Sequence, residues 1–200
     1  MTPEEFREQL LKQSSEEIVE QIILADNPGA YLATDALPAL ERSIRAKFGM
    51  TDEHPLSTIV VGSAKLGFAM LEKPGGEGRP YKPAYRAYQP GQSDIDVAIV
   101  SPVLYGKIWL ELAQFGANQH SFPWRSDLSA YMLHGWLRPD KFPFRAPKRC
   151  MDWKELINEM SRSKHFRYKN LRCGIFHSRT FLKIYQLRGV IAAQRAERNS

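Results

Sequence analysis

The spacing of apolar residues predicts three helices in the first fifty positions. Thr2-Pro3-Glu4-Glu5 has the form of a capping box with proline at the first helical position, so a helix is expected from there to about Lys12. Ser14-Ser15-Glu16-Glu17 repeats this start signal, and apolar residues follow on one face as far as Ala25. A third helix is expected from Thr34 or Asp35 to a stop at Gly49.

Short runs of β-branched residues predict the strands. Ser57–Val61 and Ile95–Val100 have the composition of buried strands, and Leu171–Phe176 is the last strand expected. A short helix is predicted at 64–70, directly after the first strand. These strands and helices predict an α/β (α+β) domain with a small mixed sheet.

Residues 72–92 are too rich in glycine and proline for a regular element. Five of the first nine positions are Gly or Pro, so the segment is expected to be a long surface loop or a hairpin extension. Its tyrosines and cations are candidates for contacts with a base or a phosphate, and a disordered tip is the alternative. They are Tyr81, Tyr85, Tyr88, Arg79, Lys82 and Arg86.

The second half of the chain predicts four more helices, at about 102–115, 124–134, 152–161 and 179–195, with an extended segment at 136–143 broken by two prolines. Trp109 and Trp136 are expected in the core. The inward face of the last helix is predicted to hold Phe181, Ile184, Leu187 and Ile191.

Composition indicates one domain over residues 1–200, with a helical part at 1–50, a core at 57–143 and a basic part at 144–200. A hydrophobic content of 43% suffices for a core, and no apolar run approaches the length of a membrane helix. The acidic start is unlike a secretory signal, so a cytoplasmic location is expected. Cys150 and Cys173 lack metal-ligand spacing and favour a reduced pair over a disulfide.

Charge is unevenly distributed along the chain. Residues 138–200 hold 16 Lys or Arg against 5 Asp or Glu, a net +11, whereas residues 1–137 hold 12 against 17, a net −5. This asymmetry suggests a polyanionic ligand such as a nucleotide or a nucleic acid. A solvated helix face rich in Arg and Lys explains it equally well.

Chemistry concentrates between Ile59 and Ser101. The first strand runs into Gly62-Ser63, where a small residue lets the backbone approach a ligand closely. Asp94 and Asp96 then stand at i and i+2 of a strand, so both point to the same face of the sheet. Two acids beside such a turn suit a site for a divalent metal and a triphosphate.

Strand, Gly62-Ser63, short helix, then Ser93-Asp94-Ile95-Asp96 on an apolar strand resembles the polymerase-beta-like nucleotidyltransferase superfamily. That superfamily includes poly(A) polymerases, oligoadenylate synthases and bacterial cyclic-oligonucleotide synthases. The sequence is also similar to small bacterial members, several of which act in anti-phage defence. The resemblance covers residues 57–101, and the rest of the chain matches by element order alone.

The resemblance implies a role for each matched residue. Asp94 and Asp96 would bind Mg²⁺ (or Mn²⁺), and Gly62 and Ser63 would hold the β- and γ-phosphates of ATP or another nucleotide. Lys65, or a cation of the basic C-terminal third, would add positive charge at the triphosphate. The cations that flank the last strand are Arg167, Lys169, Arg172 and Arg179.

Two features depart from the superfamily pattern. Ser63 and Asp94 are 31 positions apart, more than is usual, and the segment 72–92 accounts for the excess. The third metal-binding acid of related enzymes often lies on a neighbouring strand, before two residues and a proline. Asp140-Lys141-Phe142-Pro143 matches this arrangement, so Asp140 is a candidate third ligand and otherwise a turn residue.

The primary hypothesis is therefore a metal-dependent nucleotidyltransferase that moves a nucleoside monophosphate from an NTP or dNTP to a hydroxyl and releases pyrophosphate. The length of the chain suggests a minimal catalytic core, whose acceptor is a nucleic acid, an oligonucleotide or a protein, with an effector or partner protein. One alternative is a protein AMP-transferase of the toxin–antitoxin type. Another is a catalytically silent subunit that binds nucleotide or nucleic acid.

Overall fold

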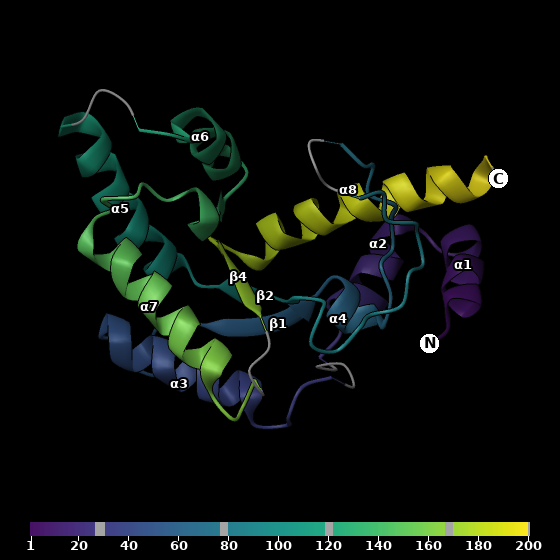
Figure 1. Cartoon of the computed structure of the whole chain (residues 1–200), viewed down its shortest axis with the longest axis horizontal. Coiled ribbons are helices and arrows are strands. Elements are labelled where there is room, and N and C mark those ends of the chain that lie inside the picture. The colour runs from purple at the N-terminus through teal and green to yellow at the C-terminus, as the bar shows by residue number, and fades with distance from the viewer. Residues whose placement is uncertain (27–30, 77–79, 119–121, 167–169, 200) are drawn as a thin grey trace.

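A four-stranded mixed sheet lies between two groups of helices (Figure 1). The computed structural model describes residues 1–26, 31–76, 80–118, 122–166 and 170–199. The sheet has the order β1-β2-β4-β3, in which β2 and β4 are parallel and the outer pairs are antiparallel. The strands are β1 (Ser57–Val61), β2 (Ile95–Val100), β3 (Trp136–Leu137) and β4 (Leu171–Phe176). This architecture confirms the predicted α/β class.

The N-terminal helices begin at the predicted capping boxes. Thr2 and Glu5 cap α1 (Pro3–Lys12) reciprocally, and Ser14 and Glu17 do the same for α2 (Ser15–Ile18). The second helix continues as the π-helical turn η1 (Val19–Ile23). After it comes α3 (Ala36–Phe48), which ends at the predicted glycine, Gly49, in the left-handed region.

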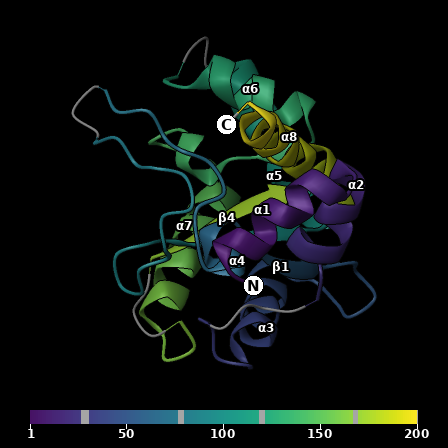
Figure 2. The same cartoon turned by 90° about the vertical axis from the view of Figure 1, so that its right-hand side faces the viewer.

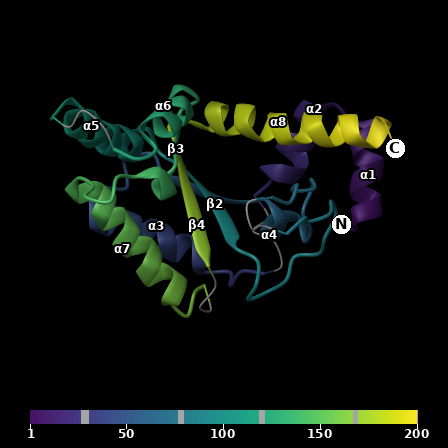
Figure 3. The same cartoon turned by 45° about the horizontal axis from the view of Figure 1, so that its top comes forward.

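The two faces of the sheet pack against different helices, because successive strand residues point to opposite faces. Ile95, Val97 and Ile99 belong to a core shared with α3, α5 (Pro102–Asn118) and α7 (Lys148–Arg162). Ala98 and Phe176 belong to a second core, shared with α1, α2 and α8 (Arg179–Arg198). Figure 3 shows α8 and α7 on opposite sides of β4 and β2.

The inward face of α8 differs from the predicted one. Its buried positions are Leu182, Val190, Ala193 and Gln194, whereas Ile184 and Ile191 are exposed. Gln194 joins the N-terminal helices to α8: its side chain donates to the carbonyls of Leu10 and Gln13 and accepts from the Ser15 hydroxyl. Gln194 is thus a buried polar residue that satisfies its hydrogen bonds, although its polarity favours an exposed position.

The described residues of the segment 72–92, together with residues 68–71 before it, form a hairpin extension, one of the two predicted arrangements. The helix before it, α4 (Ser63–Leu66), is shorter than expected because Gly67 adopts φ +90°. Two pairs of residues, Phe68 with Ala87 and Lys73 with Lys82, bridge the arms of the extension. Figure 2 shows it reaching outward from the helices, while the Tyr85 hydroxyl at its base donates to Glu197 of α8.

The remaining predicted elements are present with shifted bounds. The region after α5 contains α6 (Arg125–Leu133), the two-residue strand β3 and the 3₁₀ turn η2 (Pro139–Lys141). The helix α7 begins four positions before the expected start.

Trp109, expected in the core, is 51% exposed, since α5 turns Leu104, Ile108 and Leu112 inward instead. Cys150 and Cys173 are buried and unbonded, as predicted. No described helix is both long and apolar enough to span a bilayer.

The tight turn into β3 gives a test of the fold. Gly135 has φ +62°, and a Cβ there would lie 2.3 Å from the ring of Phe181. Gly135→Ala should therefore lower the free energy of unfolding by more than 1 kcal/mol, through strain and overpacking. Gly106→Ala is the matched control: a Cβ there meets open space within α5, so this change should raise stability by about 0.5–1 kcal/mol. Urea unfolding measures both, and equal stabilities would contradict the turn described here.

Candidate functional site

The turn after β1 brings its backbone against a carboxylate. Val61 pairs with Asp96 across the sheet, so the chain leaves β1 level with this acid. Gly62 follows with φ +67° and ψ −150°, and a Cβ on it would stand 3.1 Å from Asp96 Oδ2. Glycine is required here for its conformation and for this close approach. The structure thus brings Gly62 and Asp96 together, as the sequence pattern predicted.

Asp94 and Asp96 lie close enough to influence one another. Burial raises the pKa of Asp96, and the neighbouring charge of Asp94 raises it further. Arg172 and Lys73 act in the opposite direction and lower the pKa of Asp96. Two carboxylates and two cations therefore meet at the N-terminal end of β2. The side chain of Asp94 is the more accessible of the two acids, because it precedes the strand.

Arg172 is the direct partner of the acid pair. In the parallel register of β2 and β4 it lies level with Asp96, and its Nη2 is 3.0 Å from Asp94 Oδ2. Its side chain is 71% exposed, so the guanidinium can move without disturbing the core. The strand next to the two acids thus presents an arginine level with Asp96.

Asp140 does not join this group. It lies in η2, where both of its oxygens accept from the guanidinium of Arg138 at 3.0 and 2.7 Å. Among the described residues, no three acids, histidines or cysteines are close enough together to hold a metal ion. The predicted three-acid set is therefore not assembled, because Pro139 turns the chain into η2 and Arg138 engages Asp140.

Lys65 has a hydrogen-bond partner outside the acid pair. Its ammonium donates to the carbonyl of Ala25 at 2.7 Å, and burial lowers its pKa. Lys65 therefore holds α4 to the segment after η1, and the prediction that it contacts phosphate finds no support in this geometry. Ser63, the first residue of α4, is half-buried beside Gly62, and its hydroxyl has no hydrogen bond to a described residue.

One tyrosine of the extension lies beside the acids. Burial raises the pKa of Tyr88, with further contributions from Tyr31, Asp94 and Asp96, and its ring centroid is 4.4 Å from that of Tyr31. Tyr81 and Tyr85 bond instead to glutamates, Glu72 and Glu197. Of the predicted phosphate-binding cations, Arg179 pairs with Glu20, while Arg79, Arg167 and Lys169 lie outside the described residues.

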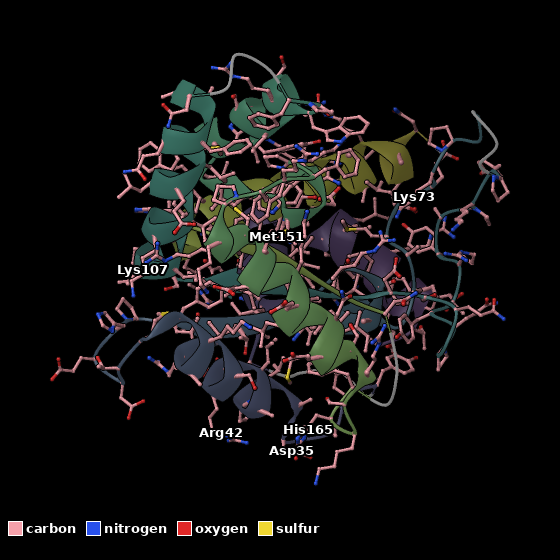
Figure 4. All side chains as sticks on the ribbon, turned by 60° about the vertical axis from the view of Figure 1, so that its left-hand side comes forward. Asp35, Arg42, Lys73, Lys107, Met151 and His165 are labelled. Carbon is pink, nitrogen blue, oxygen red and sulfur yellow. The ribbon has the colours of Figure 1, made fainter. Side chains whose placement is uncertain are left out.

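Lys73 is the site residue that sequence reasoning missed. It lies on the extension, where glycines and prolines remove the periodicity from which a side chain's direction is inferred. Figure 4 labels it on the same side of the molecule as α8, far from the Asp35–His165 ion pair that joins α3 to the end of α7 at 2.8 Å. No described carboxylate forms an ion pair with Lys73, and its positive charge acts on Asp96 through space.

The acid pair fits one mode of magnesium binding. Mg²⁺ is usually held by one or two carboxylates, with waters and substrate phosphates completing its octahedron. Asp94 and Asp96 supply two such carboxylates on one face, and the missing side chain of Gly62 leaves room beside them. The site lacks the ligands for an all-protein cage, so water or the oxygen atoms of a bound substrate would complete the coordination of a metal here.

Comparisons of the chain with protein-family models, with curated proteins and with solved structures found no match. The site is therefore interpreted from its own geometry and from the sequence resemblance.

The burial of Asp96 predicts how stability depends on pH. Because its folded-state pKa is raised, ionisation opposes folding; this cost is absent well below pH 4 and is fully present above the folded-state pKa. Asp96→Asn should therefore melt at a higher temperature than the parent protein at pH 7, and the difference should shrink as the pH falls towards 4.

Asp52→Asn is the control, because the side chain of Asp52 is fully exposed. It should leave the melting temperature nearly unchanged throughout this pH range. Calorimetry at several pH values measures both variants. A lower melting temperature for Asp96→Asn at pH 7 would show that the carboxylate stabilises the fold and that its environment has been misjudged.

Proposed function

We propose that the chain is a metal-dependent nucleotidyltransferase, which moves a nucleoside monophosphate from an NTP or dNTP to a hydroxyl and releases pyrophosphate. One observation carries the proposal: the Gly62 backbone approaches the carboxylate of Asp96, with Asp94 and two cations around it. Joined to the resemblance of residues 57–101, this arrangement supports a donor-triphosphate site.

In this proposal Asp94 and Asp96 hold Mg²⁺ or Mn²⁺ jointly with the phosphates. The metal would activate the attacking hydroxyl and neutralise the leaving pyrophosphate. The protein groups align the reactants and supply charge, without a covalent step of their own. Ser63 and the glycine turn lie beside the acids, where a triphosphate could be held close to the backbone.

Arg172 and Lys73 take the place that the resemblance gave to Lys65. In the unliganded protein their two positive charges offset the two carboxylates. When a metal–triphosphate complex binds, the metal ion can pair with the two carboxylates, and the phosphates can pair with Arg172 and Lys73. The guanidinium of Arg172 is well shaped to grip phosphate oxygens once it leaves Asp94, because its donors lie in one rigid plane.

The two enzyme hypotheses differ in the molecule that supplies the acceptor hydroxyl. A nucleic acid or oligonucleotide acceptor corresponds to synthesis of a nucleotide product, as in the defence enzymes that the sequence resembles. A protein acceptor corresponds to AMP transfer of the toxin–antitoxin type. No acceptor groove among the described residues favours one over the other, so the assay below decides between them by its product.

Incubation with each α-labelled NTP and dNTP in the presence of Mg²⁺ should release pyrophosphate and label an acceptor. A ladder of free oligomers identifies a nucleotide acceptor, and label on a protein band identifies protein AMP transfer. Asp94→Ala with Asp96→Ala should abolish both products, because the metal loses both protein ligands. Asp140→Asn should retain activity if its thermal stability is preserved, since Asp140 binds the guanidinium of Arg138 and not the metal. Intact activity in the double variant would refute the site assignment.

The arginine in β4 favours a second candidate, a subunit that binds a nucleotide without turning it over. Asp94 is already paired with Arg172, and no third acid among the described residues completes a metal-binding group, so a metal here would depend on water or substrate for its other ligands. Triphosphate binding with no pyrophosphate release, under conditions that support folding, would establish this reading.

The variant Arg172→Gln tests whether the guanidinium pairs with Asp94 in the free protein and with the triphosphate in the complex. If the guanidinium leaves Asp94 for the triphosphate, Arg172→Gln should tighten binding of Mg²⁺ alone by about two- to fivefold, because an exposed ion pair is lost. The same change should weaken triphosphate binding by about tenfold or more, since charge-assisted hydrogen bonds are lost.

Calorimetric titration with MgCl₂ and with tripolyphosphate measures these opposite effects. Arg42→Gln removes the same charge from the exposed face of α3 and should change neither affinity. If Arg172→Gln weakens both ligands, or neither, the guanidinium does not pass between carboxylate and phosphate.

A further inference from the structure

A pocket of about 310 Å³ lies between α6, β3 and α8, outside the acid pair. We call it the aromatic pocket. Its lining combines rings and aliphatic carbons with one arginine, Arg188, and none of these residues has a role in the proposed chemistry. It is lined by Asp127, Ala130, Tyr131, His134, Trp136, Phe181, Ile184, Tyr185 and Arg188.

Trp136 is the central ring of this pocket. Its indole stacks parallel to Phe176 at 5.6 Å, meets Tyr185 at 4.4 Å and receives Tyr131 edge-on at 4.9 Å. Gly174 makes this placement possible, because a Cβ there would lie 2.5 Å from Trp136 Nε1. The wall is therefore fixed by packing and needs little reordering when a flat ligand arrives.

The same indole carries an unused donor. Trp136 Nε1 is buried and has no hydrogen-bond partner among the described residues. A buried donor without a partner costs free energy, which a ligand acceptor beside it would recover. An aromatic ligand with a ring nitrogen or a carbonyl oxygen offers such an acceptor, whereas an aliphatic ligand does not.

Two arginines lie at the pocket, and the one without a described acid partner, Arg188, gives it a net positive charge. The guanidinium of Arg138 lies 4.8 Å from the centroid of Tyr131 and 5.3 Å from that of Trp136, held there by Asp140. Arg188, at the rim beside His134, pairs with no described carboxylate. The one acid in the lining, Asp127, is paired with Lys141 at 3.0 Å. The charge left over favours a ligand that is aromatic at one end and anionic at the other.

Strand register connects the pocket to the acid pair. Trp136 pairs with Phe176, its Nε1 lies over Gly174, and Arg172 lies level with Asp96. These three positions of β4 share a face, and a two-residue step is about 6.6 Å along a strand. The indole thus lies roughly one step from the acids. Burial raises the pKa of Tyr185, and among the nearby charges Asp96 raises it further while Arg188 lowers it.

We propose that the aromatic pocket binds the base of the nucleotide whose phosphates occupy the acid pair. The base stacks on the rings of Trp136 and Tyr185, and the sugar and phosphates extend from the pocket towards Arg172 and the acids. Arg188 provides positive charge at the outer rim. This inference rests on the proposed function for the phosphate end, and it assigns the base end to residues that the sequence placed elsewhere: Trp136 in the core, and Phe181 and Ile184 on the inward face of α8.

Paired ligands test it. ATP, GTP, CTP and UTP with Mg²⁺ are titrated calorimetrically against the parent protein and against Tyr185→Ala, with tripolyphosphate as the ligand that lacks a base. Loss of one stacking ring should weaken at least one NTP by about 5- to 100-fold and leave tripolyphosphate unchanged. Arg188→Gln provides a second, charge-only change in the pocket, and it should weaken the same NTP.

Two control variants show whether the loss of NTP binding is specific to the aromatic pocket. Trp109→Ala removes an exposed aromatic ring of α5 outside the pocket, and Tyr81→Ala removes an exposed ring of the extension. Both should bind every NTP as the parent protein does. If Tyr81→Ala weakens binding and Tyr185→Ala does not, the base lies at the extension and the proposal is overturned.

Nucleoside binding tests the aromatic pocket independently of the proposed nucleotidyltransferase activity. Adenosine, guanosine, cytidine and uridine lack phosphates, and saturation-transfer NMR detects their weak binding without Mg²⁺. Contact with at least one of them that Tyr185→Ala abolishes, and that Asp94→Ala with Asp96→Ala leaves intact, supports the pocket even if no nucleotide transfer occurs. NTP binding that matches tripolyphosphate binding, with no nucleoside contact, overturns the pocket and leaves the donor site standing.

Discussion

The contact on which the site depends is the approach of the Gly62 backbone to the Asp96 carboxylate. It requires a residue without Cβ at positive φ, and it requires β1 and β2 to pair in a register that sets Val61 opposite Asp96. That register is held by the two cores, since Ile59 and Val60 face opposite sides of the sheet and are both buried. A one-residue slip would turn Asp96 towards the core and Val97 towards the site. The geometry of the acids is thus a consequence of how the sheet is buried.

The charge balance at the acids explains why a basic C-terminal third surrounds an acidic motif. Part of that positive charge is used within the fold, in the pairs Arg138–Asp140, Lys148–Asp152, Arg149–Glu111 and Arg179–Glu20. Arg172 differs from these because it reaches the acid pair, and Arg188 differs because it lies at a pocket rim without an acid partner. These pairs account for four of the 16 cations of residues 138–200. An anionic ligand for Arg172 and Arg188 stays a proposal.

The helix α8 connects these regions. One side of it packs Leu182, Val190 and Ala193 into the core, and Gln194 fastens α1 and α2 to it through three hydrogen bonds. Another side presents Phe181, Ile184 and Tyr185 to the aromatic pocket. Its C-terminal end receives the hydroxyl of Tyr85 from the extension. The same helix that closes the sheet thus also forms one wall of the pocket, which explains why its apolar pattern is broader than one buried stripe requires.

The sequence by itself determined the helix caps, the three longer strands, the glycine turn and the two acids on one face of β2. These depend on local chemistry: capping hydrogen bonds, β-branched runs, the freedom of glycine and the two-residue period of a strand. The tertiary structure alone decided that Arg172 and Lys73, rather than Lys65, face the acids, and that Asp140 serves Arg138. It also decided that Trp136 forms a pocket wall. The reason is that β2 and β4 become neighbours only after a long crossover, and no local pattern encodes which side chain of one strand lies level with which of the other.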